Sequence, residues 1–207
     1  MADRAPFRLY LVTDRAGTNG RPLLSVIEQA LHGGVDAVQL RERDLPTKEL
    51  LELAHHVRDL CRRHNARLLV NDRIDVALAV GADGVHLPAS SFLPADARRL
   101  LGPQALIGVS THRSEDIGAA AAGGADFVVF GPVFDTPSKR PFGAPLGLDA
   151  LAAATQAVAL PVLAIGGITA ARVDAVRHCG ACGVAVISAI GAADDPRAAA
   201  AALRALI

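Results

Sequence analysis

The chain has 207 residues, of which 51% are hydrophobic and 20% charged, as expected of a packed globular protein with one large domain or two small ones. Its 21 basic and 21 acidic side chains cancel, which argues against nucleic acid as a partner. No stretch is long and apolar enough to span a bilayer, and the first residues lack the apolar core of a signal peptide. We therefore expect a soluble cytoplasmic protein with no membrane partner.

Short apolar runs alternate with amphipathic stretches along the whole chain. Strands are expected at residues 8–13, 34–40, 67–70, 81–87, 106–110, 124–130, 161–165 and 180–186. Helices are expected at residues 23–32, 47–64, 74–80, 94–101, 114–122, 148–158, 170–178 and 196–207. Strict alternation favours a parallel sheet and eight units favour closure, so we predict an α/β fold: a (β/α)8 TIM barrel in which residues 1–207 form a single domain. An open flavodoxin-like sheet is the alternative, but it needs only about five strands.

Four segments repeat one pattern, in which a glycine is followed two residues later by Asp or Cys and then by a strand. They begin at Gly34, Gly81, Gly124 and Gly180. Each glycine comes where a helical pattern ends, as expected of a helix C-terminus. Cys182 takes the Asp position of the fourth repeat, so we expect a small buried thiol there. The alternative, a zinc or redox pair with Cys179, lacks a second pair of ligands at the partner spacing.

Candidate site residues lie at or just after the end of every expected strand, and in a barrel of this class the active site lies at the carboxyl ends of the strands. In chain order they are Thr13, Asp14, Arg15, Gln39, Arg41, Arg43, Asn71, Asp72, Arg73, His86, Ser91, Ser110, His112, Thr136, Ser138, Lys139, Gly166, Gly167, Ile187 and Ser188. Because one fold would bring all of them to one rim, their convergence is the argument for function.

Several of these residues suit anions. The side chains of Arg41, Arg43 and Lys139 supply positive charge, and guanidinium groups match phosphate oxygens with forked donors. The turn at Gly166-Gly167 lets backbone N–H groups approach a phosphate closely, and Ile187-Ser188 follows the last strand, where barrels often hold phosphate. We therefore expect a monophosphate near strands seven and eight and a pyrophosphate near strands two, three and six.

Asp72 is the carboxylate placed to meet a divalent cation, and Mg²⁺ commonly uses one or two carboxylates together with substrate phosphates. Purely structural roles stay open for the same residues. They are a helix cap at Asn71-Asp72, ion pairs of Arg41 and Arg43 with Glu42 or Asp44, a tight turn at Gly166-Gly167 and a satisfied core histidine at His86.

Seven short motifs, specific by their number and order, carry a resemblance to a known family. They begin at Tyr10 (YLVTDR), Val38 (VQLRER), Val70 (VNDRIDVAL), Ile107 (IGVS), Phe130 (FGPVFDTPSK), Ala164 (AIGGI) and Val184 (VAVIS). With them the chain resembles the thiamine phosphate synthase/TenI family along nearly its whole length. The resemblance implies a (β/α)8 barrel. Synthases of the family join hydroxymethylpyrimidine pyrophosphate to thiazole phosphate and release pyrophosphate, whereas the TenI type tautomerises the thiazole phosphate.

The resemblance also implies roles for individual residues. Gln39 would contact the pyrimidine, Thr136 would lie against the thiazole, and Asp72 would hold Mg²⁺. The pyrophosphate would be held by Arg41, Asn71, Ser110, Ser138 and Lys139, with Arg43 as a further substrate-binding cation. Of these, Arg41, Ser110 and Lys139 would serve the transfer itself. The thiazole phosphate would be bound by Gly167, Ile187 and Ser188, with Gly166 beside them.

Three departures from the family pattern bear on the choice of activity. Synthases usually have Lys in place of Arg43 and a second Mg²⁺-binding Asp in place of Ser91, so we expect weak Mg²⁺ binding. Tautomerases carry a catalytic His at the position of Pro132, which cannot transfer a proton, although His112 is a candidate acid/base. We therefore prefer the synthase, with a TenI-like tautomerase and a non-catalytic binder of thiamine precursors as alternatives. Its partners would be the two phosphorylated substrates, and assembly of identical chains stays open.

Overall fold

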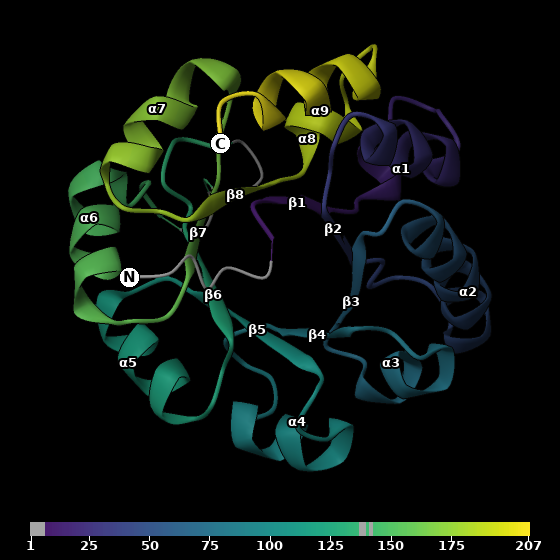
Figure 1. Cartoon of the computed structure of the whole chain (residues 1–207), viewed down its shortest axis with the longest axis horizontal. Helices are drawn as coiled ribbons and strands as arrows, with labels where there is room; N and C mark the ends of the chain where they lie inside the picture. The colour runs from purple at the N-terminus through teal and green to yellow at the C-terminus, as the bar shows by residue number, and fades with distance from the viewer. Residues whose placement is uncertain (1–6, 137–139, 141–142) are drawn as a thin grey trace.

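The structure is a closed barrel of parallel strands inside a ring of helices (Figure 1). The computed structural model describes residues 7–136, 140 and 143–207. In that part of the chain the strands are β1 (Leu9–Val12), β2 (Ala37–Leu40), β3 (Arg67–Asn71), β4 (Gly84–Leu87), β5 (Leu106–Thr111), β6 (Phe127–Phe130), β7 (Val162–Ile165) and β8 (Gly183–Val186). Each strand pairs in parallel with the next and β8 pairs with β1, which confirms the predicted (β/α)8 TIM barrel.

The helices cover the outside of the barrel. They are η1, a 3-10 helix (Arg15–Gly17), α1 (Leu23–His32), α2 (Thr47–Arg63), α3 (Ile74–Val80), α4 (Pro94–Leu101), α5 (Ser114–Ala122), α6 (Gly147–Ala157), α7 (Ala170–His178), α8 (Ser188–Gly191) and α9 (Pro196–Arg204). The sequence pattern misses η1 and α8, because both are too short to show a helical period. Among the helices just named, none is long and apolar enough to cross a membrane.

The strands of the repeat begin three residues later than the pattern predicts. The glycine that starts each repeat belongs to the end of the preceding helix or the turn after it, with φ of 98° at Gly34, 61° at Gly81, 85° at Gly124 and 88° at Gly180. This left-handed region suits glycine, which has no Cβ to clash there. The last helix likewise ends at Arg204 rather than at residue 207.

The aspartates of the repeat join strands and helices at the amino end of the barrel. Asp83 accepts hydrogen bonds from the backbone N–H of Leu68 at 2.9 Å and from Arg58 of α2 at 2.8 Å. Asp36 likewise accepts from the backbone N–H of Leu9 and from the side chain of Arg204. Asp126 accepts from the backbone N–H of Ile107 and from the side chain of Arg98. In the fourth repeat the Cys182 thiol donates to the Val162 carbonyl at 3.2 Å, and burial raises the pKa of this thiol to about 11, as expected of a structural cysteine.

Aromatic side chains fill the barrel below its mouth. The ring centroids of Phe7, Tyr10 and Phe127 lie 4.8, 5.0 and 5.9 Å apart. Gly108 leaves the room they need, since a Cβ there would come within 2.2 Å of Phe127 and 2.8 Å of His86 Nδ1. A second, larger apolar layer lies between the strands and the helices. The amino end is thus closed by packing, and chemistry is left to the carboxyl end.

Candidate active site

His86 and Ser110 meet inside the mouth of the barrel, from neighbouring strands β4 and β5. His86 Nε2 lies 2.9 Å from Ser110 Oγ, and His86 is 2% exposed. Burial, helped by the charge of Arg41, lowers the pKa of His86 to about 3, so the ring is neutral. The prediction of a satisfied core histidine is therefore correct for burial but wrong for satisfaction, because Nδ1 has no hydrogen-bond partner among the described residues and Nε2 contacts a candidate site residue. The contact could have been predicted from the alternation of side chains along the strands, because this alternation turns both side chains toward the barrel interior.

Gln39 also lies inside the mouth, where it is 3% exposed. Its Nε2 donates to the Tyr10 hydroxyl oxygen at 3.1 Å, and burial raises the pKa of Tyr10 well above its usual value. Among the described residues none donates to the side-chain oxygen Oε1 of Gln39, whereas its backbone carbonyl accepts from the N–H of Thr13 at 3.0 Å. The amide is thus held at one end by the barrel core and is available at the other.

The guanidinium groups of Arg41 and Arg43 form no ion pair with any described residue. The carboxylates beside them are directed elsewhere: Glu42 accepts from the Arg15 backbone N–H at 3.2 Å, and Asp44 pairs with the Arg15 side chain at 2.6 Å. The structural alternative of pairing within this segment is therefore wrong. Two positive charges are left at the carboxyl end of β2, free to meet an anion.

Asp72 lies at the carboxyl end of β3, with its backbone N–H bonded to the His86 carbonyl at 3.0 Å and a φ of 65°. The hydroxyl of Ser91 donates a hydrogen bond to Asp72 Oδ1. The alternative of a helix cap is wrong, since Arg73 is the N-cap of α3 and no side chain caps it. In residues 7–136, 140 and 143–207 no three His, Cys, Asp or Glu side chains cluster, and the side chain bonded to Asp72 Oδ1 is a hydroxyl rather than a second carboxylate.

The loops after β6 and β7 pack closely at Gly166 and Gly167. The N–H of Phe134 donates to the Gly166 carbonyl at 3.1 Å, and a Cβ on Gly167 would come within 2.7 Å of the Asp135 carbonyl oxygen. This turn thus requires glycine for packing as well as for its positive φ. Thr136 donates its hydroxyl to the Phe134 carbonyl at 3.1 Å. Two predicted residues of this loop, Ser138 and Lys139, lie outside the described residues.

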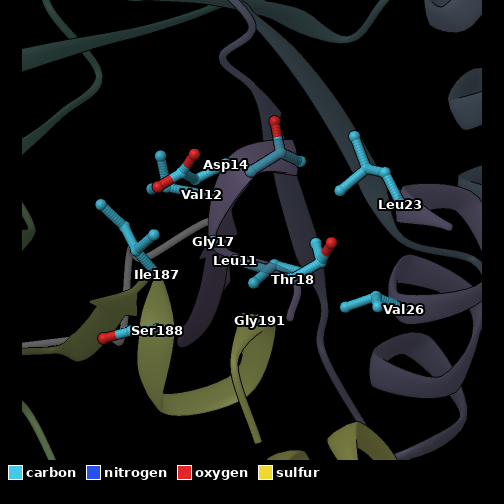
Figure 2. Close-up of a pocket in the computed structure, with 11 residues that line it drawn as sticks. Leu11, Val12, Asp14, Gly17, Thr18, Leu23, Val26, Ile187, Ser188 and Gly191 are labelled. Atoms are coloured by element: carbon cyan, nitrogen blue, oxygen red, sulfur yellow. The ribbon is translucent and has the colours of Figure 1, made fainter. Parts of the chain in front are cut away.

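A pocket opens where β1 and β8 end. Figure 2 shows Ile187 and Ser188 on one side of it and Leu23 and Val26 of α1 on the other. The residues that line it are Leu11, Val12, Thr13, Asp14, Gly17, Thr18, Leu23, Val26, Ile187, Ser188 and Gly191. The short helix α8 begins at Ser188, so its first backbone N–H groups lie at this pocket. Two of the residues predicted to bind a phosphate are therefore placed at one cavity.

His112 stands just beyond the end of β5, with Nδ1 2.6 Å from the carbonyl oxygen of Gly131. A carbonyl only accepts, so Nδ1 carries the proton and Nε2 is left for a ligand. The neighbouring Pro132 sits at the end of β6 and offers no proton-transfer group. The structure thus brings His112 to the rim, beside the position where the tautomerases carry their histidine.

Comparison with known proteins identifies the family. The family model described as thiamine monophosphate synthase matches residues 9–190. A putative thiamine-phosphate synthase of Geobacter sulfurreducens is 55% identical over 99% of this chain and 96% of that protein, and the thiamine-phosphate synthase of Chloroflexus aurantiacus is 48% identical over 97% and 93%. The solved thiamine phosphate pyrophosphorylase of Pyrococcus furiosus matches with a TM-score of 0.89 at 37% identity, over 98% of this chain and 96% of that one.

These similarities extend over the barrel and over the strand ends that carry the candidate residues. The names of these relatives, one synthase, one putative synthase and one pyrophosphorylase, support a transferase of thiamine biosynthesis and do not favour the tautomerase alternative. The chain belongs to the thiamine monophosphate synthase family.

Proposed function

We propose that this chain joins hydroxymethylpyrimidine pyrophosphate to thiazole phosphate, giving thiamine phosphate and pyrophosphate. The observation that carries the proposal is the rim where Arg41 and Arg43, without ion-pair partners among the described residues, lie at the same end of the barrel as Ser110 and Asp72. In the reaction the C–O bond to pyrophosphate breaks with its electron pair on the leaving oxygen. The thiazole nitrogen then forms the new C–N bond, so no protein nucleophile is required.

The pyrophosphate end of the site would be served by Arg41, Arg43, Asn71 and Ser110. Fixed positive charge stabilises the charge that develops on the leaving group. Because His86 Nδ1 has no partner in the described part of the chain, the ring avoids an unpaired N–H by carrying its proton on Nε2. Nε2 then donates to Ser110 Oγ, and the Ser110 hydroxyl is free to donate to a pyrophosphate oxygen. Gln39, held by Tyr10, would orient the pyrimidine ring.

Mg²⁺ would rest on Asp72, with water and pyrophosphate oxygens as its other ligands. When bound, it would neutralise part of the charge on the pyrophosphate. The residues fit a weak site, since Asp72 is a single carboxylate and its Oδ1 already accepts a hydrogen bond from Ser91. A hydroxyl is a poorer ligand for Mg²⁺ than the carboxylate that synthases usually have at that position.

The thiazole phosphate would bind between the loops after β6, β7 and β8. Its phosphate would meet the backbone N–H groups at Gly167 and at Ser188, where α8 begins, with Ile187 against the ligand. Thr136 would lie against the thiazole ring. The predicted roles of Ser138 and Lys139 in holding pyrophosphate belong to the same proposal. The free thiols Cys61, Cys179 and Cys182 support a reducing compartment such as the cytoplasm.

One assay tests the proposal. Purified protein receives both phosphorylated precursors with and without Mg²⁺, and thiamine phosphate is measured. We expect product that depends on Mg²⁺, and a loss of about a hundredfold in kcat/KM for Arg41→Ala, with no change for Arg62→Ala, an exposed arginine of α2 far from the rim. No product at high enzyme and metal concentration rejects the synthase. Aromatisation of the thiazole tautomer, lost in His112→Ala, would instead favour the isomerase.

A further inference from the structure

Glu42 is a buried carboxylate to which the proposed transfer gives no role. It follows Arg41 directly, is 5% exposed, and its Oε1 has no hydrogen-bond partner among the described residues. Burial raises the pKa of Glu42, because removal from water disfavours the charged form. Glu42 lies between two arginines of the rim, and its carboxylate is unfavourable to bury. Its contacts indicate a specific role for this side chain.

Two of the hydrogen bonds between the loops after β1 and β2 join a backbone N–H of one loop to a buried side chain of the other, in opposite directions. The N–H of Arg15 donates to Glu42 Oε2 at 3.2 Å, and the N–H of Arg41 donates to Thr13 Oγ1 at 2.9 Å. Thr13 is 2% exposed and Glu42 is 5% exposed, so both acceptors are shielded from water. Each loop thus has its backbone held by a buried side chain of the other, and we call this pair of bonds the loop clasp.

The loop clasp connects the two halves of the candidate site. On the β1 side, Thr13 and the residues after it line the pocket that contains Ser188. Figure 2 labels Asp14, Gly17 and Thr18 there. On the β2 side, Arg41 and Arg43 flank Glu42 at the rim. A shift of one loop against the other would therefore move the pocket wall relative to the cations. In a transfer between two bound substrates, misplacement of this kind is costly.

We propose that Glu42 is a positioning residue, which through the N–H of Arg15 fixes the β1 loop to the β2 loop and so holds the pyrophosphate-binding cations and the Ser188 pocket in register. The identity of the two ligands rests on the proposed function. The Arg15 side chain contributes little, because its Nε lies 3.9 Å from Glu42 and its other end pairs with exposed Asp44. The essential contact is the backbone N–H, which every residue but proline supplies at position 15.

The test compares variants in the full chain by calorimetry, with inorganic pyrophosphate plus Mg²⁺ as one probe and thiazole phosphate as the other. Glu42→Ala is expected to weaken both affinities about tenfold. Glu42→Gln keeps an oxygen acceptor for the Arg15 N–H and is expected to bind within about threefold of the wild type. The exposed control Glu49→Ala of α2 is expected to behave as the wild type.

Steady-state kinetics adds a readout that a merely structural role would not move. Glu42→Ala is expected to raise KM for both substrates more than it lowers kcat, with rescue by Gln. If Glu42→Ala fails to fold, Thr13→Val takes its place, because it removes the other bond of the loop clasp. This variant is expected to weaken the binding of pyrophosphate. A folded Glu42→Ala with both affinities unchanged, or a Gln variant as weak as Ala, overturns the proposal. A wild type that binds both probes but makes no thiamine phosphate rejects only the proposed function.

Discussion

The hydroxyl of Ser91 donates a hydrogen bond to Oδ1 of Asp72, across the loops that follow β4 and β3. A carboxylate at position 91 would therefore lie beside Asp72 and could share a cation with it. We expect Ser91→Asp to tighten Mg²⁺ or Mn²⁺ binding about tenfold in the presence of pyrophosphate, since affinity rises with the number of charged ligands. Calorimetry and Mn²⁺ paramagnetic resonance measure this without turnover.

The neighbouring Ser90 is exposed and provides a matched control, because Ser90→Asp adds the same charge one residue away. Ser90→Asp should bind the metal with the same affinity as the wild type. Without metal, Ser91→Asp should also lower the melting temperature through repulsion from Asp72, and Mg²⁺ should restore it. Equal metal binding by the two variants would place the cation away from this pair of loops.

The buried His86 makes stability depend on pH. Its pKa is lowered to about 3 in the folded chain, whereas an unfolded histidine has a pKa of about 6.5. The neutral ring therefore stabilises the fold fully above pH 6.5, and this contribution is lost as pH falls from 6.5 toward 3, where the unfolded chain binds the extra proton. From pH 7 to pH 5 the loss attributable to His86 is about 2 kcal/mol.

Urea unfolding at pH 7 and pH 5 measures this loss. His86→Gln should remove about 2 kcal/mol of the pH dependence, whereas His56→Gln, on the exposed side of α2, should keep the dependence of the wild type. Identical pH dependence in the wild type and His86→Gln would show that residue 86 does not titrate on unfolding. His86→Gln should also reduce kcat/KM, because Ser110 loses the ring that holds its hydroxyl oxygen.

The barrel was predictable because its strands are buried on both faces and therefore read as apolar runs, and because repeated glycines mark the helix ends between them. The placement of Ser110 and Asp72 at one rim was predictable, since topology alone sends strand ends there. The contact of Ser91 with Asp72 and the burial of Glu42 were not, because each depends on where two loops distant in sequence meet. Nothing in the local pattern separates Glu42 from the exposed Asp44 two residues later.

Asp83 stabilises the barrel at the end opposite to the site. Its carboxylate, 11% exposed, pairs with Arg58 at 2.8 Å and accepts the N–H of Leu68. Asp83→Asn should cost about 3 kcal/mol in the free energy of unfolding, because it leaves a half-buried guanidinium without its counter-charge. Chemical denaturation measures the loss. The exposed Asp59→Asn of α2 should change stability by less than about 0.5 kcal/mol.

Because Asp83 lies at the amino end of the barrel, Asp83→Asn should keep the kcat of the folded wild type at a temperature where both are native. A large fall in kcat at that temperature would show that the two ends of the barrel are coupled. The same substitution cannot be made in the fourth repeat, where Cys182 stands in place of Asp and its thiol donates to the Val162 carbonyl.

Two glycines offer opposite outcomes for the same change to alanine. At Gly167, φ is 62° and a Cβ would come within 2.7 Å of the Asp135 carbonyl oxygen and 2.8 Å of Phe134 Cβ. Gly167→Ala should therefore destabilise the fold by about 1–3 kcal/mol. If the proposed role of the Gly167 N–H holds, the variant should also raise KM for the thiazole phosphate, because the turn is displaced. Gly118 lies inside α5, and beyond its neighbours and its own helix backbone no described atom lies within 4 Å of an added Cβ. Gly118→Ala should stabilise the fold by about 0.5–1 kcal/mol and leave both KM values unchanged.

Thermal unfolding with steady-state kinetics measures both variants. A Gly167→Ala protein as stable and as active as the wild type would mean that the loops after β6 and β7 can separate without consequence for the site.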